Sequence, residues 1–332
     1  MILIPPFLAE ILPGILRVSA IVTVIALVFL FLCPNLIVSE IMYIMHLKRT
    51  KKEKWARECS CDDPTHVRMY NEGKEWISQF ADKKVDVHIV NEGLNLYGEF
   101  YDLGATKTAI LVSGRTEALE YSYYFSRPYI LAGCNVLFID QRAHGLSDGE
   151  YNTIGFEEHK DLIAWIEYLQ KNHHTEAVYL HGCCIGASCC LFALTAQNKP
   201  DCVRGFVAEG MYPNFYESFK NHMIELKKPV FPGMAMINMM MVLHTGHSMK
   251  NGPIEVIDEL TTPILMLHGT ADLYSLPEKA ECLYDKCGSE NKNIIWFENG
   301  EHSLLRPLDS EKYDSAIITF IQEVEERERI SA

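Results

Sequence analysis

From residue 85 onward, short runs of Val, Ile and Leu alternate with segments of helical periodicity. The runs have strand length and no polar alternation, as strands buried on both faces require. Helical patterns lie between them, most clearly at 156–170 and 312–326. This alternation predicts a doubly wound, mostly parallel α/β sheet over residues 85–330. The expected strands are Val85–Val90 and Leu94–Phe100, which form a hairpin, then Thr108–Val112, Asn135–Asp140, Ala177–Gly182, Val203–Ala208, Pro263–Gly269 and Asn293–Phe297.

The N-terminal part of the chain is apolar, and it carries no charge between Arg17 and Glu40. Residues 18–33 are almost wholly apolar, and Pro34-Asn35 separates them from a second apolar run, residues 36–38. A helix that spans a bilayer needs about 20 apolar residues, so the segment is just long enough. The pattern predicts a single transmembrane helix, with residues 1–47 as a membrane anchor.

Six basic residues follow the apolar segment, between positions 48 and 57. A cleaved signal peptide, the alternative, carries its basic residues before the apolar run. We therefore favour an uncleaved anchor, followed by a basic juxtamembrane linker at 48–84. The positive-inside rule then places the following domain in the cytoplasm. The eleven cysteines, an odd number with two adjacent pairs, also favour a reducing compartment, although the opposite orientation stays open.

The formal net charge of the chain is −14, and it is unevenly distributed. Residues 1–58 hold seven of the 30 Lys and Arg and four of the 44 Asp and Glu, so the remainder carries −17. Such an acidic body repels phosphate backbones, which argues against nucleic acid as a partner. We also expect no metal and no cofactor. Cys59 and Cys61 have only Cys282 and Cys287 as a second pair, at the wrong spacing for a zinc ribbon.

A glycine-flanked turn follows the strand predicted at 177–182. Its sequence is Gly182-Cys183-Cys184-Ile185-Gly186, and a helical pattern comes next. The glycines leave room for the strained strand-to-helix turn that lifts a nucleophile clear of a sheet, and Cys184 occupies the nucleophile position. A thiol beside a histidine ionises readily and is a strong nucleophile. The alternative is a junction of small residues that contains a buried thiol.

Two further candidates each follow a predicted strand. Asp272 comes after the strand at 263–269, and His302 comes after the strand at 293–297. Ligands of doubly wound sheets bind beyond the carboxyl ends of the strands. We predict that His302 takes the thiol proton of Cys184 and later activates water, while Asp272 orients the imidazole. A surface histidine and a helix-capping aspartate are the alternatives.

An acyl-transfer site also needs two backbone donors for the oxyanion. We expect one to be the N–H of Ile185, at the start of the helix after Cys184. The other should lie in the loop 113–117, and we select the N–H of Arg115. The Arg115 side chain could bind an anionic group of the substrate, or it could form an ordinary ion pair.

Together these residues resemble the α/β-hydrolase superfamily, in particular its monoacylglycerol-lipase and lysophospholipase-like group, over residues 85–325. The resemblance rests on Gly114–Glu117, on Asp140–Gly149, on the turn around Cys184, and on Asp272 and His302. It implies the α/β-hydrolase fold and a small-molecule acyl ester or thioester as substrate. The Asp140–Gly149 loop has a structural role in that family, so no catalysis is assigned to its histidine. An anchor followed by this domain also resembles membrane-anchored bacterial hydrolases.

The segment 209–262 interrupts the strand alternation, and in this superfamily such an insertion forms a cap over the site. It contains six methionines between positions 234 and 249. Flexible thioethers suit an adaptable apolar pocket, but they could equally pack the cap onto the core. With a membrane anchor alongside, we expect a lipophilic acyl group. His244 and His247 are expected to be surface or packing residues.

Two positions depart from the family pattern: Ser113 replaces the usual histidine, and Cys184 replaces the usual serine. The first is tolerable because the oxyanion donors are backbone groups. The second leaves three functions open. They are hydrolysis of an ester or thioester by a Cys-His-Asp triad, acyl transfer from the same cysteine, and non-catalytic binding on a hydrolase fold.

Overall fold

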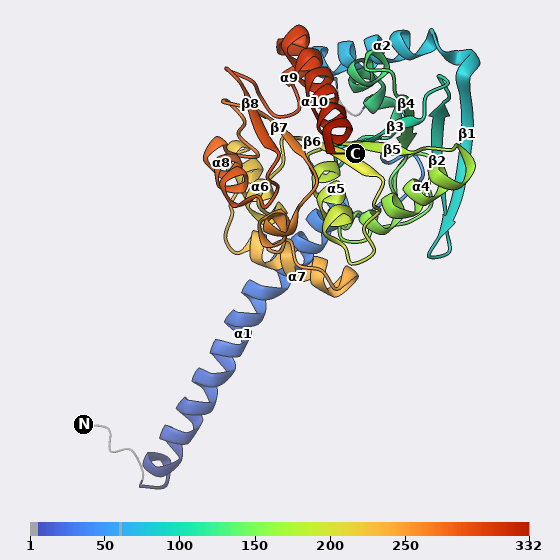
Figure 1. Cartoon of the computed structure of the whole chain (residues 1–332). Helices are drawn as coiled ribbons and strands as arrows, with labels where there is room; N and C mark the ends of the chain where they lie inside the picture. The colour runs from blue at the N-terminus through green and yellow to red at the C-terminus, as the bar shows by residue number, and fades with distance from the viewer. Residues whose placement is uncertain (1–5, 60–61, 332) are drawn as a thin grey trace.

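The computed structural model of the chain describes residues 6–59 and 62–331, and its centre is one eight-stranded sheet (Figure 1). The strand order is β1-β2-β4-β3-β5-β6-β7-β8, and every pairing from β4 to β8 is parallel. β1 and β2 form an antiparallel hairpin, and β2 pairs antiparallel with β4. All eight predicted strands are therefore confirmed. They are β1 (Lys84–Asn91), β2 (Leu94–Tyr101), β3 (Lys107–Val112), β4 (Asn135–Ile139), β5 (Ala177–Cys183), β6 (Val203–Glu209), β7 (Ile264–Gly269) and β8 (Lys292–Phe297).

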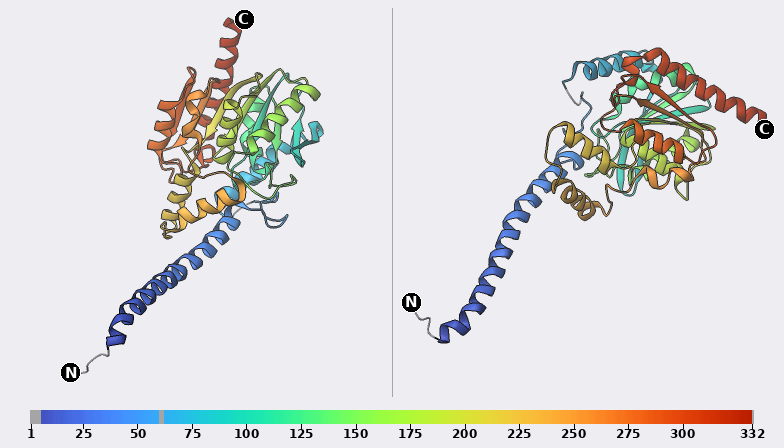
Figure 2. Two further views of the ribbon diagram at one scale, coloured as in Figure 1. Left: turned by 90° about the horizontal axis from the view of Figure 1, so that it is seen from below. Right: turned by 90° about the vertical axis from the view of Figure 1, so that its left-hand side faces the viewer.

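Helices cover both faces of the sheet (Figures 1 and 2). Side chains alternate along each strand, so in β4 Leu137 and Ile139 join the core on one face, and Val136 and Phe138 join the core on the other. The first core includes α4 (Glu158–Asn172), α5 (Ile185–Thr195) and α8 (Pro277–Lys286). The second includes α2 (Pro64–Ser78), α3 (Arg127–Leu131), α9 (Leu305–Leu308) and α10 (Ser310–Ser331).

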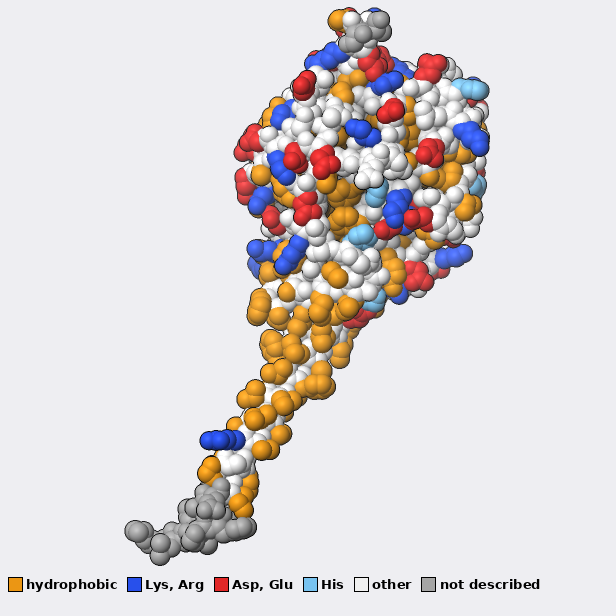
Figure 3. Space-filling model, turned by 60° about the horizontal axis from the view of Figure 1, so that its bottom comes forward, with side chains coloured by type: hydrophobic (Ala, Val, Ile, Leu, Met, Phe, Trp, Pro, Cys, Tyr) orange, Lys and Arg blue, Asp and Glu red, His pale blue; other side chains and the backbone are white. Residues whose placement is uncertain are grey.

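The N-terminal apolar segment forms one long helix, α1 (Pro6–Leu47), which projects from the body (Figures 1 and 3). The helix continues through Pro34 and Asn35, which separate its two apolar runs. Proline lacks only the N–H to one carbonyl, and the Asn35 side-chain amide adds a hydrogen bond to the Phe31 carbonyl, 2.7 Å away. The part Pro13–Leu47 is long and apolar enough to cross a membrane, and its most apolar stretch is wholly exposed.

The last turns of α1 pack against α7 (Gly233–Thr245), and the views in Figures 1 and 2 show the two helices side by side. Tyr43 and Leu47 are fully buried there. The His244 ring stacks on Tyr43 with centroids 4.9 Å apart, and its Nε2 lies 2.9 Å from a Glu40 carboxylate oxygen. The end of α1 is thus part of the folded body, and His244 has the packing role expected of it.

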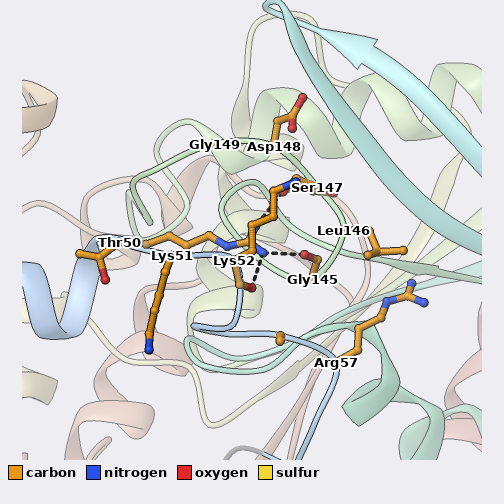
Figure 4. Close-up of a pocket in the computed structure, with 11 residues that line it drawn as sticks. Thr50, Lys51, Lys52, Arg57, Gly145, Leu146, Ser147, Asp148 and Gly149 are labelled. Carbon is orange, nitrogen blue, oxygen red and sulfur yellow. Dashed lines mark hydrogen bonds between the residues drawn. The ribbon is translucent and has the colours of Figure 1, made fainter.

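Residues 48–59, predicted as the start of a linker, lie against the loop that follows β4. The Arg49 guanidinium donates to the Gly145 and Lys52 carbonyls. Figure 4 shows residues 50–52 beside residues 145–149. Trp55 is buried, with its ring stacked on His144 at 4.7 Å. A hollow of about 380 Å³ remains between residues 49–57 and 145–149, and none of the predicted site residues lines it. This segment is therefore packed on the domain.

Two helices lie between β6 and β7, where the cap was predicted: α6 (Phe215–Glu225) and α7. Short 3₁₀ turns at Pro253–Glu255 and Ile257–Glu259 lead back into the sheet. Four of the six methionines are buried in one cluster with Tyr43 and Leu47 of α1. These four side chains pack the segment onto the body, which is one of the two roles considered for the methionines. They are Met234, Met240, Met241 and Met249.

Candidate active site

Cys184 lies at a sharp turn between the end of β5 and the start of α5. Its φ is +53°, a conformation that non-glycine residues rarely adopt, and its N–H donates to the Glu209 carbonyl at 2.9 Å. A Cβ added to Gly182 would lie 2.4 Å from the backbone of Gly186, and one added to Gly186 would lie 2.2 Å from the Val112 carbonyl oxygen. The glycines are therefore required by close backbone contacts, as the motif predicted.

His302 and Asp272 are brought together from the loops after β8 and β7. The His302 Nδ1 lies 2.7 Å from the Asp272 Oδ2. The other carboxylate oxygen accepts hydrogen bonds from the N–H groups of Tyr274 and Ser275, each at 2.8 Å. The Asp272 carboxylate is almost fully buried, so these three contacts hold it in one orientation toward the imidazole.

The electrostatics of this pair favour charged groups. Burial lowers the pKa of His302, but the charges of Asp272 and Cys184 and hydrogen bonds to both outweigh it and raise the pKa well above 6.5. Burial raises the pKa of Asp272, and the His302 charge and hydrogen bond bring it below its usual value. An imidazolium at His302 is therefore stabilised from both sides, by the carboxylate and by the sulfur.

Gly210, directly after β6, makes room for the His302 ring. Its φ is +59°, and an added Cβ would lie 3.0 Å from the imidazole Cε1 and 3.2 Å from Nδ1. Only glycine combines this backbone conformation with this close approach.

Cys184 and His302 line the same cavity, of about 210 Å³, beneath the cap helix α6. Several residues that line this cavity were not predicted from the sequence. The aromatic residue Tyr274, two positions after Asp272, places its ring edge-on to His302 at 5.2 Å. The α6 residues could have been found from their helical spacing of three, four and seven, once a cap helix was expected. These are Phe215, Ser218, Phe219 and His222.

The loop 113–117 forms the opposite wall of the cavity. The Gly114 N–H donates to the Glu117 carboxylate at 3.0 Å, and the His144 Nε2 lies 2.6 Å from the Arg115 carbonyl oxygen. The hydrogen bonds of the described residues leave the N–H groups of Arg115 and Ile185 without an acceptor. Two backbone donors thus remain available, one in this loop and one at the start of α5 beside Cys184.

A buried cluster with metal-binding residue types lies beneath the turn, within the part of the chain that the structure describes. The His181 Nε2 lies 3.5 Å from the Cys183 Sγ and 3.7 Å from a Glu209 carboxylate oxygen. Tyr313 donates a hydrogen bond to Glu209, and burial raises the pKa of the Cys183 thiol well above 9, which disfavours the thiolate that a metal needs. The other candidate thiol pair, Cys59 and Cys61, includes a residue, Cys61, that lies outside the described residues.

The chain is similar in sequence to one family model and to one bacterial protein. The family model described as serine aminopeptidase, S33, matches residues 243–309, a stretch that includes Asp272 and His302. An uncharacterized Bacillus subtilis protein, YqkD, is 27% identical over 217 residues, which are 64% of this chain and 70% of that protein.

Solved structures with the same architecture include esterases and a lipase. A Pyrococcus furiosus esterase superimposes with a TM-score of 0.61 at 21% identity, over 74% of this chain and 93% of its own. An Exiguobacterium antarcticum esterase gives a TM-score of 0.55 at 16% identity over 72% and 100% of the two chains. A monoacylglycerol lipase from Paleococcus ferrophilus gives a TM-score of 0.52 at 21% identity, over 69% of this chain and 99% of its own. The chain therefore has the α/β-hydrolase fold, with a mostly parallel sheet.

Proposed function

We propose that the chain hydrolyses an ester or thioester with a lipophilic acyl group, and that Cys184 is its nucleophile. One observation carries this proposal: Cys184 stands on a strained turn in the same cavity as His302, whose imidazole lies 2.7 Å from a buried Asp272 carboxylate. Nucleophile, histidine and acid in this arrangement are the parts that acyl transfer requires. The esterases and the lipase of the same fold support an ester as the substrate class.

The chemistry follows from these positions. His302 takes the thiol proton, and the Cys184 sulfur attacks the substrate carbonyl carbon. The N–H groups of Arg115 and Ile185 stabilise the resulting oxyanion. Collapse breaks the bond to the alcohol or thiol, which leaves with the proton from His302, and the acyl group stays on Cys184. His302 then removes a proton from water, the hydroxide attacks the acyl carbon, and the carboxylic acid departs as the Cys184 sulfur regains its proton.

We further propose that α1 anchors the protein in a membrane, with the domain on the cytoplasmic side. The length and apolar surface of the helix support the anchor, and the basic residues after it support the orientation. An anchored site beneath an apolar cap suits acyl chains that partition into lipid.

Intact-mass spectrometry of the full chain in detergent tests the role of Cys184. The parent, Cys184→Ala and Cys282→Ala are incubated with a long-chain activated ester and with a thioester. Cys282 lies exposed on α8, so its variant controls for acylation of a surface thiol. We expect one acyl adduct on the parent and on Cys282→Ala, lost into water with time, and none on Cys184→Ala.

Three other outcomes would change the assignment. Acylation of Cys184→Ala at the parent rate would exclude Cys184 as nucleophile. An adduct that is stable in water but is discharged by added amines or alcohols would identify an acyltransferase. An absence of both adduct and donor consumption would leave non-catalytic binding.

A further inference from the structure

The Arg115 side chain joins the active-site cavity to the end of α1. It lines the cavity together with Cys184 and His302. Its Nη1 donates to the His46 carbonyl at 3.2 Å and lies 3.3 Å from the His46 Nδ1. A cation at the carboxyl end of a helix is favourable, so one role of this side chain is to cap α1.

Capping uses only one of the nitrogens of the guanidinium. Its Nε and Nη2 groups donate to none of the described residues, and neither is sealed from solvent. Within residues 6–59 and 62–331, no carboxylate forms an ion pair with Arg115. This contrasts with the buried arginines Arg142 and Arg306, each of which is paired with a carboxylate at 2.6–2.7 Å.

The charged groups around Arg115 do not balance its positive charge, so this part of the cavity favours an anion. Burial and the Arg115 charge lower the pKa of Lys54 to about 8, and the same two causes lower the pKa of His222. Two acidic residues, Glu117 and Glu225, are candidates to offset this positive charge. Burial raises the pKa of Glu117, which favours its neutral form, and Glu225 lies 3.8 Å from the His222 ring.

Burial also lowers the pKa of Arg115, and the charge on Cys184 is the first of the effects that raise it. A half-buried cation without a carboxylate partner is costly, and a bound anion removes that cost.

We propose that the substrate carries an anionic group, a carboxylate or a phosphate, which the free face of the Arg115 guanidinium binds. The inference rests on the proposed function and specifies its substrate class: an acyl ester or thioester with a negative charge near the scissile bond. Arginine presents two parallel N–H donors, and carboxylates and phosphates match them. The same residue then serves twice, with its backbone N–H toward the oxyanion and its side chain toward the anionic group.

The test compares substrates that differ only in this charge. Three esters share one acyl chain and one spacer, and end in a neutral primary amide, a carboxylate or a phosphate monoester. The specificity constant kcat/KM of each is measured with the full chain in detergent, for the parent, Arg115→Gln, Arg115→Lys and Arg68→Gln. Arg68 is an exposed arginine on α2, away from the cavity, and serves as the matched control.

We expect the parent to prefer an anionic ester over the neutral one by about 10- to 100-fold, the range of a charge-assisted hydrogen bond. The ratio should fall to near one in Arg115→Gln, stay partly in Arg115→Lys, and be unchanged in Arg68→Gln. The ratio is informative whatever happens to absolute rates, and the two anionic arms distinguish a phosphate from a carboxylate source. A thermal melt of each variant shows whether the fold is retained.

Two results would overturn the inference without touching the proposed function. In the first, the parent cleaves all three esters equally well. In the second, Arg115→Gln slows all three by the same factor, which would show that the side chain acts only on Cys184 or on the end of α1. A parent that cleaves none of the three and forms no acyl adduct would instead refute the proposed function itself.

Discussion

At the scale of single residues, the site depends on close backbone approaches as much as on reactive groups. Cys184 is held at positive φ by a turn whose glycines have no room for a side chain. His302 fits its place because Gly210 has none either. Such strain persists only where surrounding contacts outweigh it, and here the contacts come from β3, β6 and α5.

Gly210→Ala tests this dependence. The new Cβ would lie about 3.0 Å from the His302 ring and should displace the imidazole, so we expect kcat to fall at least 10-fold. The strained backbone should also reduce the free energy of unfolding by about 1–2 kcal/mol. Gly93→Ala is the matched control, because Gly93 also has positive φ but no atom lies near its added Cβ. That variant should lose stability and keep its kcat. Equal losses of activity in both variants would mean that strain alone, and not contact with His302, explains the effect.

At the scale of secondary-structure elements, the structure joins α1 to the segment between β6 and β7. The buried methionines of that segment pack around Tyr43 and Leu47, and this cluster also contacts Cys184. Helix α6 forms the roof of the cavity, and its position depends on this packing. The C-terminal end of α1 therefore supports the site.

Leu47→Ala measures the strength of this contact. Leu47 is fully buried, so the substitution removes apolar contacts and leaves a cavity, which costs about 2–5 kcal/mol. We expect a lower melting temperature of the full chain in detergent. The matched control is Leu30→Ala, on the same helix at 69% exposure, which should leave the melting temperature unchanged. If both variants melt like the parent, the end of α1 does not support the domain.

At the scale of the whole molecule, an apolar helix meets an acidic body through a short basic segment. Residues 48–59 carry most of the positive charge of the N-terminal region, and they are packed against the loop 145–149. This packing holds the domain close to the end of α1, with the cavity next to that end through Arg115 and His46. With α1 in a membrane, as proposed, an amphiphilic substrate leaving the bilayer would have a short path to Cys184.

The orientation of the domain can be measured with the exposed thiol of Cys282. Intact cells that express the full chain are treated with a membrane-impermeant maleimide, before and after permeabilisation. We expect Cys282 to be labelled only after permeabilisation, because the basic residues after α1 favour the cytoplasmic side. A Cys282→Ser variant identifies the signal that belongs to this thiol. Labelling of intact cells at the permeabilised level would place the domain outside.

The sequence alone determined the features that depend on local pattern. Strand-length apolar runs predicted β3 to β8, and in β3 to β7 burial on both faces imposes this composition directly. The hairpin of β1 and β2 was predicted from two β-rich runs joined by a turn signal. The position of Cys184, Asp272 and His302 after three different strands predicted that they would meet, since parallel strands end at one edge. Flanking glycines marked the turn, because only residues without a side chain fit there.

Only the tertiary structure decided the contacts between segments distant in the chain. These include the 2.7 Å contact of His302 with Asp272, the burial of Leu47, and the position of Arg115 between Cys184 and His46. Such contacts depend on how elements pack, and a periodicity reports only which face of an element is buried. Helix α1 likewise continues through Pro34, where local propensity disfavours a helix, because the surrounding helix tolerates one missing hydrogen bond.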